Sequence, residues 1–324
     1  MIEVKNLVKR YGDHVAVNNL SFTVEEGQIY GFLGPNGAGK STTMNIITGY
    51  LASTEGEVLI NGHNILEEPE EAKKCIGYLP ELPPVYTDMT VLEYLKFVAE
   101  LKKIPKDQRK KQILEVMNLV KITDMQNRLI KNLSKGYRQR VGLAQAVLGY
   151  PPIIILDEPT VGLDPKQIIE IRDLIKSLGK KHTVILSSHI LSEISAVCDH
   201  IFIISKGKLV ASDSTENLTL MMSGVQEIEL LVKAEEEAAK EALRTISQVQ
   251  KYHMTKGNEE GTVKILLSAE KGVDIREAVF FAFADAKLPI LEMKAEGKSL
   301  EEIFLELTSQ KAGAAQRKEQ EVVA

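Results

Sequence analysis

The sequence predicts an α/β domain with a helical insertion, followed by a smaller α+β domain. From residue 2 to about residue 214, short β-rich runs alternate with helical patterns, which is typical of a largely parallel sheet covered by helices. Between about residues 83 and 150 only helical patterns occur, so we interpret this stretch as an insertion. After about residue 217 the chain changes character. We therefore expect domains over residues 1–217 and 218–309, followed by a flexible tail at 310–324.

The bulk composition is that of an ordinary globular protein. The 324 residues are 44% hydrophobic and 26% charged, with a formal net charge of -5, whereas general nucleic-acid binders tend to be strongly basic. No apolar run approaches the roughly 20 residues that cross a bilayer, and the first residues lack the pattern of a signal peptide. We therefore expect a cytoplasmic protein. Cys75 and Cys198 are too few and too far apart to indicate a zinc site or a disulfide framework.

The first chemical signal is a glycine-rich loop. Residues 34–41 read Gly-Pro-Asn-Gly-Ala-Gly-Lys-Ser, which fits the phosphate-binding pattern of two glycines, a lysine and a hydroxyl at fixed spacing. A strand-like run at 28–33 precedes the loop, and a helix with Met44, Ile47 and Leu51 on one side follows it. Glycines let the backbone N–H groups curl around phosphates, and the helix start adds its positive dipole end. The residues expected to bind ATP here are Gly34, Asn36, Gly37, Ala38, Gly39, Lys40, Ser41 and Thr42.

Two side chains of that loop have separate expected roles. Lys40 would neutralise the β- and γ-phosphates, which also gives it a part in catalysis. Ser41 would supply an oxygen ligand to Mg²⁺. The loop therefore predicts a nucleoside triphosphate and Mg²⁺ as the cofactors.

The predicted insertion opens with a helix-capping signal. Thr90 followed by Glu93 forms the capping-box pattern at the start of an amphipathic helix. A second helical pattern comes after it. The apolar face of the first helix carries Leu92, Leu95 and Ala99, and that of the second carries Leu114, Met117 and Val120.

A second chemical signal follows a buried-strand pattern at residues 153–156. The run ends in Asp157 and Glu158, and the carboxyl ends of strands are where α/β sheets bind their ligands. We expect Asp157 to belong to the Mg²⁺ shell and Glu158 to orient and polarise the attacking water as general base.

The region after residue 217 predicts a small α+β domain, with a ferredoxin-like fold as one candidate. It contains three strand-like runs and three helical ones, and no internal repeat of the phosphate loop. In chain order, the expected elements are a strand at 227–232, a helix at 236–244, a strand at 263–267, a helix at 274–284, a strand at 290–293 and a capped helix from 299.

An ordered set of motifs carries a family resemblance. Residues 133–139 read Leu-Ser-Lys-Gly-Tyr-Arg-Gln, residues 156–164 read Leu-Asp-Glu-Pro-Thr-Val-Gly-Leu-Asp, and Ser188-His189 comes next. With these motifs, residues 1 to about 214 resemble an ATP-binding subunit of an ABC transporter. Together with Leu79-Pro80-Glu81, they look most like the subunits that serve ABC-2 type exporters. The resemblance implies a P-loop NTPase core of ABC type.

The resemblance also assigns further residues. Tyr11 resembles the aromatic residue that stacks on adenine, although its phenol would equally suit an edge strand. Ser134 and Gly136 resemble the signature that closes over the γ-phosphate held by the opposite subunit. His189 resembles the switch histidine that contacts the γ-phosphate, which makes it a catalytic candidate, and Asp164 resembles the aspartate that joins two subunits.

Two positions depart from the family pattern. Glu81 occupies the place of a glutamine that contacts magnesium and water, and its carboxylate would still ligate Mg²⁺ while adding negative charge. Lys135 and Tyr137 replace the usual glycine and glutamine of the signature, but Gly136 is retained. The Glu81 departure affects the expected rate and nucleotide affinity and leaves the class unchanged, and with Gly136 present we expect the signature to make a working, if distinct, contact with the opposite subunit.

The implied function is ATP-powered transport. Two nucleotide-binding subunits, either a homodimer or a pair with a paralogue, would close on ATP and drive export through a separate membrane permease. The chain would then lie on the cytoplasmic face of the cell membrane, with no nucleic acid as partner. The apolar segment 83–86 near Glu81 would seat the permease, or would simply shape a linker. The alternative is a non-transport ABC ATPase acting on ribosomes or nucleic acid.

Overall fold

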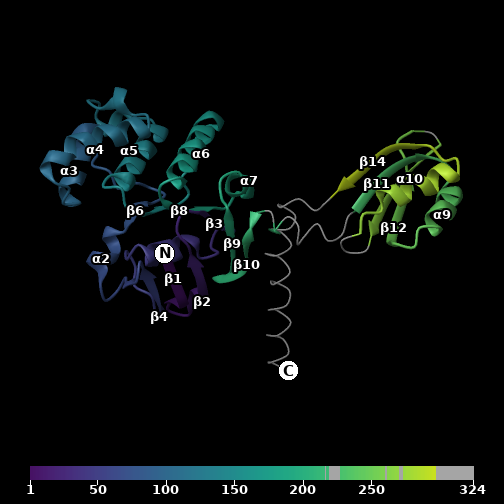
Figure 1. Cartoon of the computed structure of the whole chain (residues 1–324), viewed down its shortest axis with the longest axis horizontal. Coiled ribbons are helices and arrows are strands. Elements are labelled where there is room, and N and C mark those ends of the chain that lie inside the picture. The colour runs from purple at the N-terminus through teal and green to yellow at the C-terminus, as the bar shows by residue number, and fades with distance from the viewer. Residues whose placement is uncertain (216, 219–226, 260, 270–272, 297–324) are drawn as a thin grey trace. The chain divides into compact units, whose positions relative to one another are not determined.

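The computed structural model describes residues 1–215, 217–218, 227–259, 261–269 and 273–296. The chain divides into two compact units, Met1–Thr215 and Glu216–Ala324 (Figure 1). The expected helix from residue 299 and the expected tail at 310–324 lie outside the described residues. Within the described parts of the chain, no helix is long and apolar enough to cross a membrane.

A six-stranded sheet forms the centre of the first unit. Its strand order is β10-β9-β3-β8-β7-β6, and every neighbouring pair except β10 with β9 is parallel. The strands are β3 (Ile29–Leu33), β6 (Ile76–Leu79), β7 (Ile153–Leu156), β8 (Thr183–Ser188), β9 (His200–Ser205) and β10 (Lys208–Ser214). Because β8 lies between β3 and β7, the carboxyl ends of these three strands meet at one edge of the sheet.

A second, antiparallel sheet accompanies the parallel one, so the predicted α/β fold is confirmed with an addition. Its order is β2-β1-β4-β5, formed by β1 (Ile2–Tyr11), β2 (His14–Val24), β4 (Glu55–Ile60) and β5 (His63–Asn64). A shared core joins the two sheets. In it the ring centroid of Phe22 lies 5.0 Å from that of Phe32 and 4.9 Å from that of Phe202.

Helices cover this unit and connect its strands. They are α1 (Lys40–Ile47), α2 (Pro69–Lys74), α6 (Pro165–Gly179) and α7 (Leu191–Ser195). The sequence placed Leu51 on the helix after the loop, but α1 ends at Ile47. Gly49, with φ 67°, follows that end, and this left-handed conformation is one that glycine adopts without strain.

The segment between β6 and β7 is helical in the described structure. It contains α3 (Val91–Leu101), α4 (Lys106–Leu119), two short 3₁₀ turns at Thr123–Met125 and Ile130–Asn132, and α5 (Lys135–Val147). The capping box at the start of α3 is confirmed: the Glu93 N–H donates to Thr90 Oγ1 over 3.3 Å, and the Thr90 N–H donates to Glu93 Oε2 over 2.8 Å.

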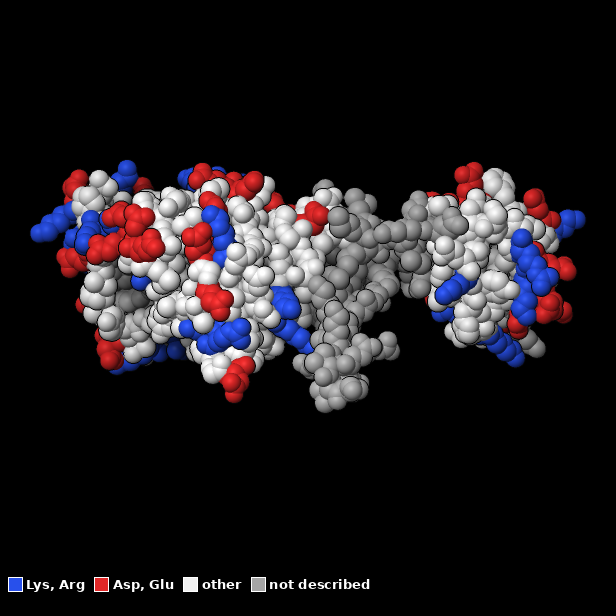
Figure 2. Space-filling view, turned by 90° about the horizontal axis from the view of Figure 1, so that it is seen from below, with Lys and Arg blue, Asp and Glu red and all other residues white. Residues whose placement is uncertain are grey.

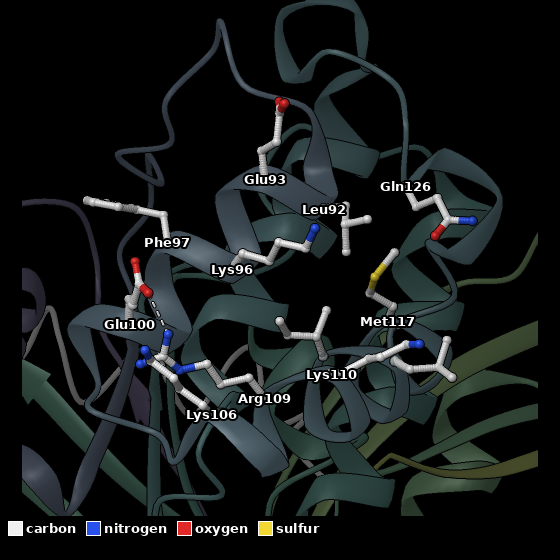
Figure 3. A pocket seen from close by; sticks show the side chains of 12 residues that line it. Leu92, Glu93, Lys96, Phe97, Glu100, Lys106, Arg109, Lys110, Met117 and Gln126 are labelled. Atoms are coloured by element: carbon white, nitrogen blue, oxygen red, sulfur yellow. Dashed lines mark hydrogen bonds and ion pairs between the residues drawn. The ribbon is translucent and has the colours of Figure 1, made fainter.

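The buried faces of α3 and α4 differ from the predicted ones. Leu95 and Ala99 are buried as expected, but Leu92 is only half-buried, and Leu114 is 50% exposed. The stripe that α3 buries begins at Val91 and continues through Leu95 and Val98, so it is rotated away from Leu92. Both leucines instead line a hollow of about 790 Å³ between α3 and α4 (Figure 3).

The second unit has the strand–helix–strand–strand–helix–strand order of a ferredoxin-like fold. Its sheet order is β12-β13-β11-β14, with all neighbours antiparallel. The elements are β11 (Glu227–Lys233), α9 (Glu236–Arg244), β12 (Val249–Lys256), β13 (Thr262–Ala269), α10 (Arg276–Asp285) and β14 (Ile290–Glu296). The sequence analysis missed β12. This edge strand contributes only the partly buried Val249 and Met254 to the core, so it shows no clear alternation.

Candidate functional site

The glycine-rich loop connects β3 to α1. It leaves the carboxyl end of β3, which is an interior strand of the parallel sheet. Gly39 precedes α1 with φ 102°, and a Cβ atom there would lie 2.6 Å from the carbonyl oxygen of Ala16. A Cβ on Gly34 would overlap the carbonyl oxygen of Ile204. Gly37, with φ 80°, has nothing within 4 Å of its would-be Cβ. Two of these glycines therefore serve packing, and Gly37 leaves the backbone open toward a ligand.

Lys40 begins α1 and is nearly buried at 6% exposure. Its Nζ donates to the carbonyl oxygen of Gly34 over 2.8 Å and lies 3.4 Å from Glu158 Oε1. The ammonium is thus held beneath the loop and next to an acid. Because the ammonium is already held in place, it can neutralise phosphate oxygens without a further change in the conformation of the side chain.

Ser41 and Asp157 come together although they lie far apart in the sequence. Ser41 Oγ donates to Asp157 Oδ1 over 3.3 Å, and Ser187 also donates to that oxygen. A hydroxyl and a carboxylate are hard oxygen ligands, so the pair fits Mg²⁺. No cluster of three or more His, Cys, Asp or Glu side chains suited to a metal occurs among the described residues. Because Mg²⁺ in proteins usually keeps several waters and binds substrate phosphates, phosphate oxygens and water would complete the shell.

Glu158 is the second residue after β7 and holds an uncommon backbone conformation. Its φ is 48°, in the left-handed region, and its N–H donates to Ser187 Oγ over 2.9 Å. One carboxylate oxygen faces Lys40, and the other lies 3.1 Å from Nδ1 of His189, which follows β8. Strained backbone of this kind concentrates at functional sites. The conformation directs the carboxylate toward the glycine-rich loop.

A pocket of about 430 Å³ lies over the loop. Of the residues predicted from the sequence, those lining it are Tyr11, Asn36, Gly37, Ala38, Gly39, Lys40, Ser41, Thr42, Glu81, Glu158 and His189. The pocket also has three lining residues that the sequence analysis missed: His14, Ala16 and Val161. Gly34 is buried beneath the loop, and Asp157 instead lines a second hollow that also contains Ser41 and Glu81.

Tyr11 stands at the end of β1, at the edge of the pocket. Its side chain is 50% exposed, and Lys9 Nζ lies 5.3 Å from the ring centroid. A base bound in the pocket would meet an exposed ring here, and stacking by Tyr11 stays a prediction.

The signature residues lie outside this pocket. Ser134 is exposed and caps α5, where its Oγ accepts from the Tyr137 N–H over 3.4 Å. Gly136 is packed so closely that a Cβ would lie 2.5 Å from Gln167 Oε1. Asp164 is exposed and caps α6, where it accepts from the Gln167 N–H over 3.0 Å. Within one chain, then, the phosphate loop and the signature are separate surfaces.

Half-buried Tyr78 lies in the second hollow, beside the predicted magnesium ligands. Burial, together with the charge of the nearby Asp157 carboxylate, raises the pKa of this phenol. Tyr78 therefore stays protonated near neutral pH, and its hydroxyl donates to Asn45 Oδ1 over 3.1 Å.

A buried carboxylate that the sequence analysis missed connects the two loops of the site. Glu193 of α7 is 6% exposed and accepts from Thr160 Oγ1 over 2.6 Å and from Ser188 Oγ over 3.0 Å. Thr160 lies two residues after Glu158, and Ser188 immediately precedes His189. One side chain thus fixes the positions of both loops.

Removing this connection is expected to slow turnover more than it weakens ATP binding. Glu193→Ala leaves two buried hydroxyls without their acceptor and frees the loops of Glu158 and His189. A displacement of about 1 Å can cost on the order of 100-fold in rate, so we expect a 10- to 100-fold lower kcat. Steady-state ATPase kinetics and nucleotide titration would measure the two effects. Glu193→Gln, which keeps an acceptor oxygen, should recover part of the rate. Equal losses in kcat and in ATP affinity would contradict the positioning role.

Comparisons with known proteins agree with the motifs. Residues 17–161 match the family described as ABC transporter. An uncharacterized ABC transporter ATP-binding protein of Bacillus subtilis is 37% identical over 312 residues, covering 96% of each chain. A bacitracin transport ATP-binding protein of Bacillus licheniformis is 42% identical over 212 residues, which cover 65% of this chain and 68% of that one.

A solved structure is similar to the first unit. It is a dimeric, post-hydrolysis state of an ATP-binding cassette bound to ADP and inorganic phosphate. The TM-score is 0.61 at 28% identity, and the match covers 66% of this chain and 99% of that one. The cassette is thus matched over almost its whole length.

Proposed function

Because the chain belongs to the ABC transporter family, as one of its ATP-binding and ATP-hydrolysing subunits, we propose that it powers export through a separate membrane permease. The observation that carries the proposal is the meeting of Lys40, Glu158 and His189 at the phosphate-loop pocket. The bacitracin transport relative supports transport, and the proposed direction, export, rests on the resemblance to ABC-2 subunits. These relatives favour transport over an action on ribosomes or nucleic acid.

In the proposed mechanism, Glu158 accepts a proton from the attacking water. Lys40 neutralises charge on the β- and γ-phosphates, and His189 holds the γ-phosphate from the end of β8. Ser41, Asp157 and Glu81 would hold Mg²⁺, which stabilises the charge that develops on the phosphate oxygens. The carboxylate of Glu158 is already 3.1 Å from His189, so both side chains can act on one reacting centre.

The proposed active unit contains two cassettes. Ser134, Gly136 and Asp164 lie outside the pocket of their own chain, and Ser134 presents a helix start with a hydroxyl, which suits an anion. A second cassette would bring its signature onto this phosphate site.

We propose the domain boundaries 1–217 and 218–309, with the helical insertion at 83–150.

The permease is proposed to dock beside the nucleotide site. Leu82 is 79% exposed and Tyr86 is 55% exposed, although both are apolar in character. Leu82 lines the second hollow together with Glu81, and Glu81 also lines the ATP pocket. A cytoplasmic helix of the permease seated there would contact a residue of the nucleotide site directly. This contact would couple ATP binding to transport.

The hollow between α3 and α4 would extend that docking surface. Figure 3 shows Leu92 and Met117 at its floor, with Lys96 and Lys110 around it. Arg109 is engaged with Glu100 across one end. The face of the first unit that Figure 2 shows carries both acidic and basic side chains, whereas nucleic-acid binding favours a basic surface. A membrane-bound partner would hold the protein at the cytoplasmic face of the membrane.

Docking can be tested by co-purification. The chain would be expressed together with a candidate permease, chosen as a polytopic membrane protein from a neighbouring gene, and solubilised in detergent. We expect the two proteins to co-purify. For the double variant Leu82→Ser, Tyr86→Ser, most of the chain should no longer co-purify with the membrane protein. Ile169→Ser, at a position that is 58% exposed on α6, is the matched control. Undiminished co-purification of the double variant would contradict this docking surface.

A further inference from the structure

The start of α5, which carries the signature, is fixed to the start of α6, which Asp164 caps. The two helices lie side by side (Figure 1) and meet at successive turns. Gly136 of α5 packs on the side chain of Gln167, and the buried Arg140 forms an ion pair with Glu170. These contacts hold the beginnings of the two helices together.

A further contact reaches beyond the helices to the loop before α6. Lys135 is the first residue of α5, and its side chain lies over Gly162 in the loop between Glu158 and Asp164. A Cβ on Gly162 would overlap Lys135 Nζ, and Cε and Cδ of the same side chain would lie 3.1 Å and 3.4 Å from it. The lysine therefore fills the space that a side chain at position 162 would take.

Lys135 restrains a stretch of this loop that lies between two anchors. On one side Thr160 donates to the buried Glu193 over 2.6 Å, and on the other Asp164 caps α6. Gly162 lies between them and is exposed. Within the described residues, the Lys135 ammonium forms no ion pair or hydrogen bond, so the aliphatic stem of the side chain makes this contact by packing.

We propose that Lys135 is a positioning residue for the site that two cassettes form. Its stem holds the loop of Asp164 against the signature, so that one cassette presents both surfaces to its partner in a fixed geometry. A loop that is already ordered loses less conformational entropy when the dimer forms. A glycine at position 135, the residue usual in the family, would have no stem to make this contact.

The same restraint acts on the catalytic side of the loop. Glu158 begins this loop, and Val161 lines the ATP pocket. The signature that faces the partner's nucleotide is thus in contact with the loop that leads to the base of its own site. This inference rests on the proposed pairing of two cassettes.

Shortening the side chain tests the contact. Lys135→Ala removes the stem, whereas Lys135→Met keeps most of its length without the charge. In the full-length Glu158→Gln protein with ATP and Mg²⁺, Lys135→Ala should raise the protein concentration needed for half-maximal dimerisation about three- to tenfold, as measured by light scattering. Because methionine is unbranched and nearly as long as lysine, Lys135→Met should stay within about twofold of the parent.

Two controls separate positioning from other effects. Because Lys135 is exposed, neither change should lower the melting temperature or the affinity of the monomer for ATP. In protein that keeps Glu158, Lys135→Ala should lower kcat more than it raises the KM for ATP, since the contact acts after ATP has bound. Equal losses of dimerisation in Lys135→Ala and Lys135→Met would overturn the positioning role, because they would assign the effect to the ammonium.

Gly162→Ala tests the same contact from the side of the loop. Its Cβ would displace the Lys135 side chain, and it would also strain the backbone because φ is 71°. The strain is present whichever residue stands at position 135, so a double-mutant cycle removes it from the comparison. We expect Gly162→Ala to weaken the dimer by a smaller factor in the Lys135→Ala protein than in the parent. Equal factors in the two backgrounds would reject the contact.

The parent protein distinguishes this inference from the proposed function. If the Glu158→Gln protein dimerises with ATP but the variants at positions 135 and 162 show none of the expected differences, Lys135 has no positioning role and the pairing of cassettes stands. If the Glu158→Gln protein stays monomeric with ATP, the pairing is rejected, and the role of Lys135 with it.

Discussion

Glu158→Gln is expected to slow ATP hydrolysis about 100- to 10,000-fold while ATP binding is retained, which is the range attributed to general-base assistance. Glutamine preserves the size of the side chain and can still bond His189, but it cannot accept a proton from water. It also removes a negative charge 3.4 Å from Lys40, so phosphate affinity should not fall. Steady-state turnover and titration with a fluorescent ATP analogue would measure rate and affinity on the same protein.

Lys40→Ala provides the contrast for this experiment. The Lys40 ammonium is held under the glycine-rich loop, so its removal should weaken phosphate binding itself. The two variants therefore separate binding from chemistry. Near-normal turnover of Glu158→Gln would reject Glu158 as the base. Unchanged ATP affinity in Lys40→Ala would reject the phosphate-loop assignment.

Ser134→Arg is expected to abolish the ATP-dependent dimer. In the Glu158→Gln background, ATP and Mg²⁺ should shift the protein from monomer toward dimer, as measured by light scattering, because hydrolysis no longer reopens the pair. An arginine at Ser134 would place a bulky cation at the exposed start of α5, where the second cassette must approach. ATP binding to the monomer should persist, since Ser134 does not line the pocket of its own chain.

A matched control separates this effect from added charge. Leu66→Arg adds the same cation at a position that is 51% exposed and lies outside both the pocket and the signature. It should dimerise with ATP as readily as the Glu158→Gln protein. If Ser134→Arg still dimerised, or if it lost ATP binding as a monomer, the role of the signature across the interface would be refuted.

Much of the fold could be predicted because its signals are local. The capping box of Thr90 and Glu93 depends on side chains bonding to backbone within one turn. The strand before Asp157 is marked by four consecutive apolar residues. Even in the second unit, α9 was predicted with its observed bounds. The edge strand β12 escaped detection because an edge strand buries too little to impose alternation.

The sequence by itself determined the chemistry of the nucleotide site, because each of its motifs is a short continuous run of residues. These motifs are the phosphate loop, an acid after one apolar strand and a histidine after another strand. Only the tertiary structure decided how these groups meet. β8 lies between β3 and β7, and this strand order sets Glu158 against Lys40 and His189. The bonds that Glu193 accepts likewise depend on packing between distant segments. Local spacing carries no information about such contacts, because sheet order and helix rotation are set by the whole core.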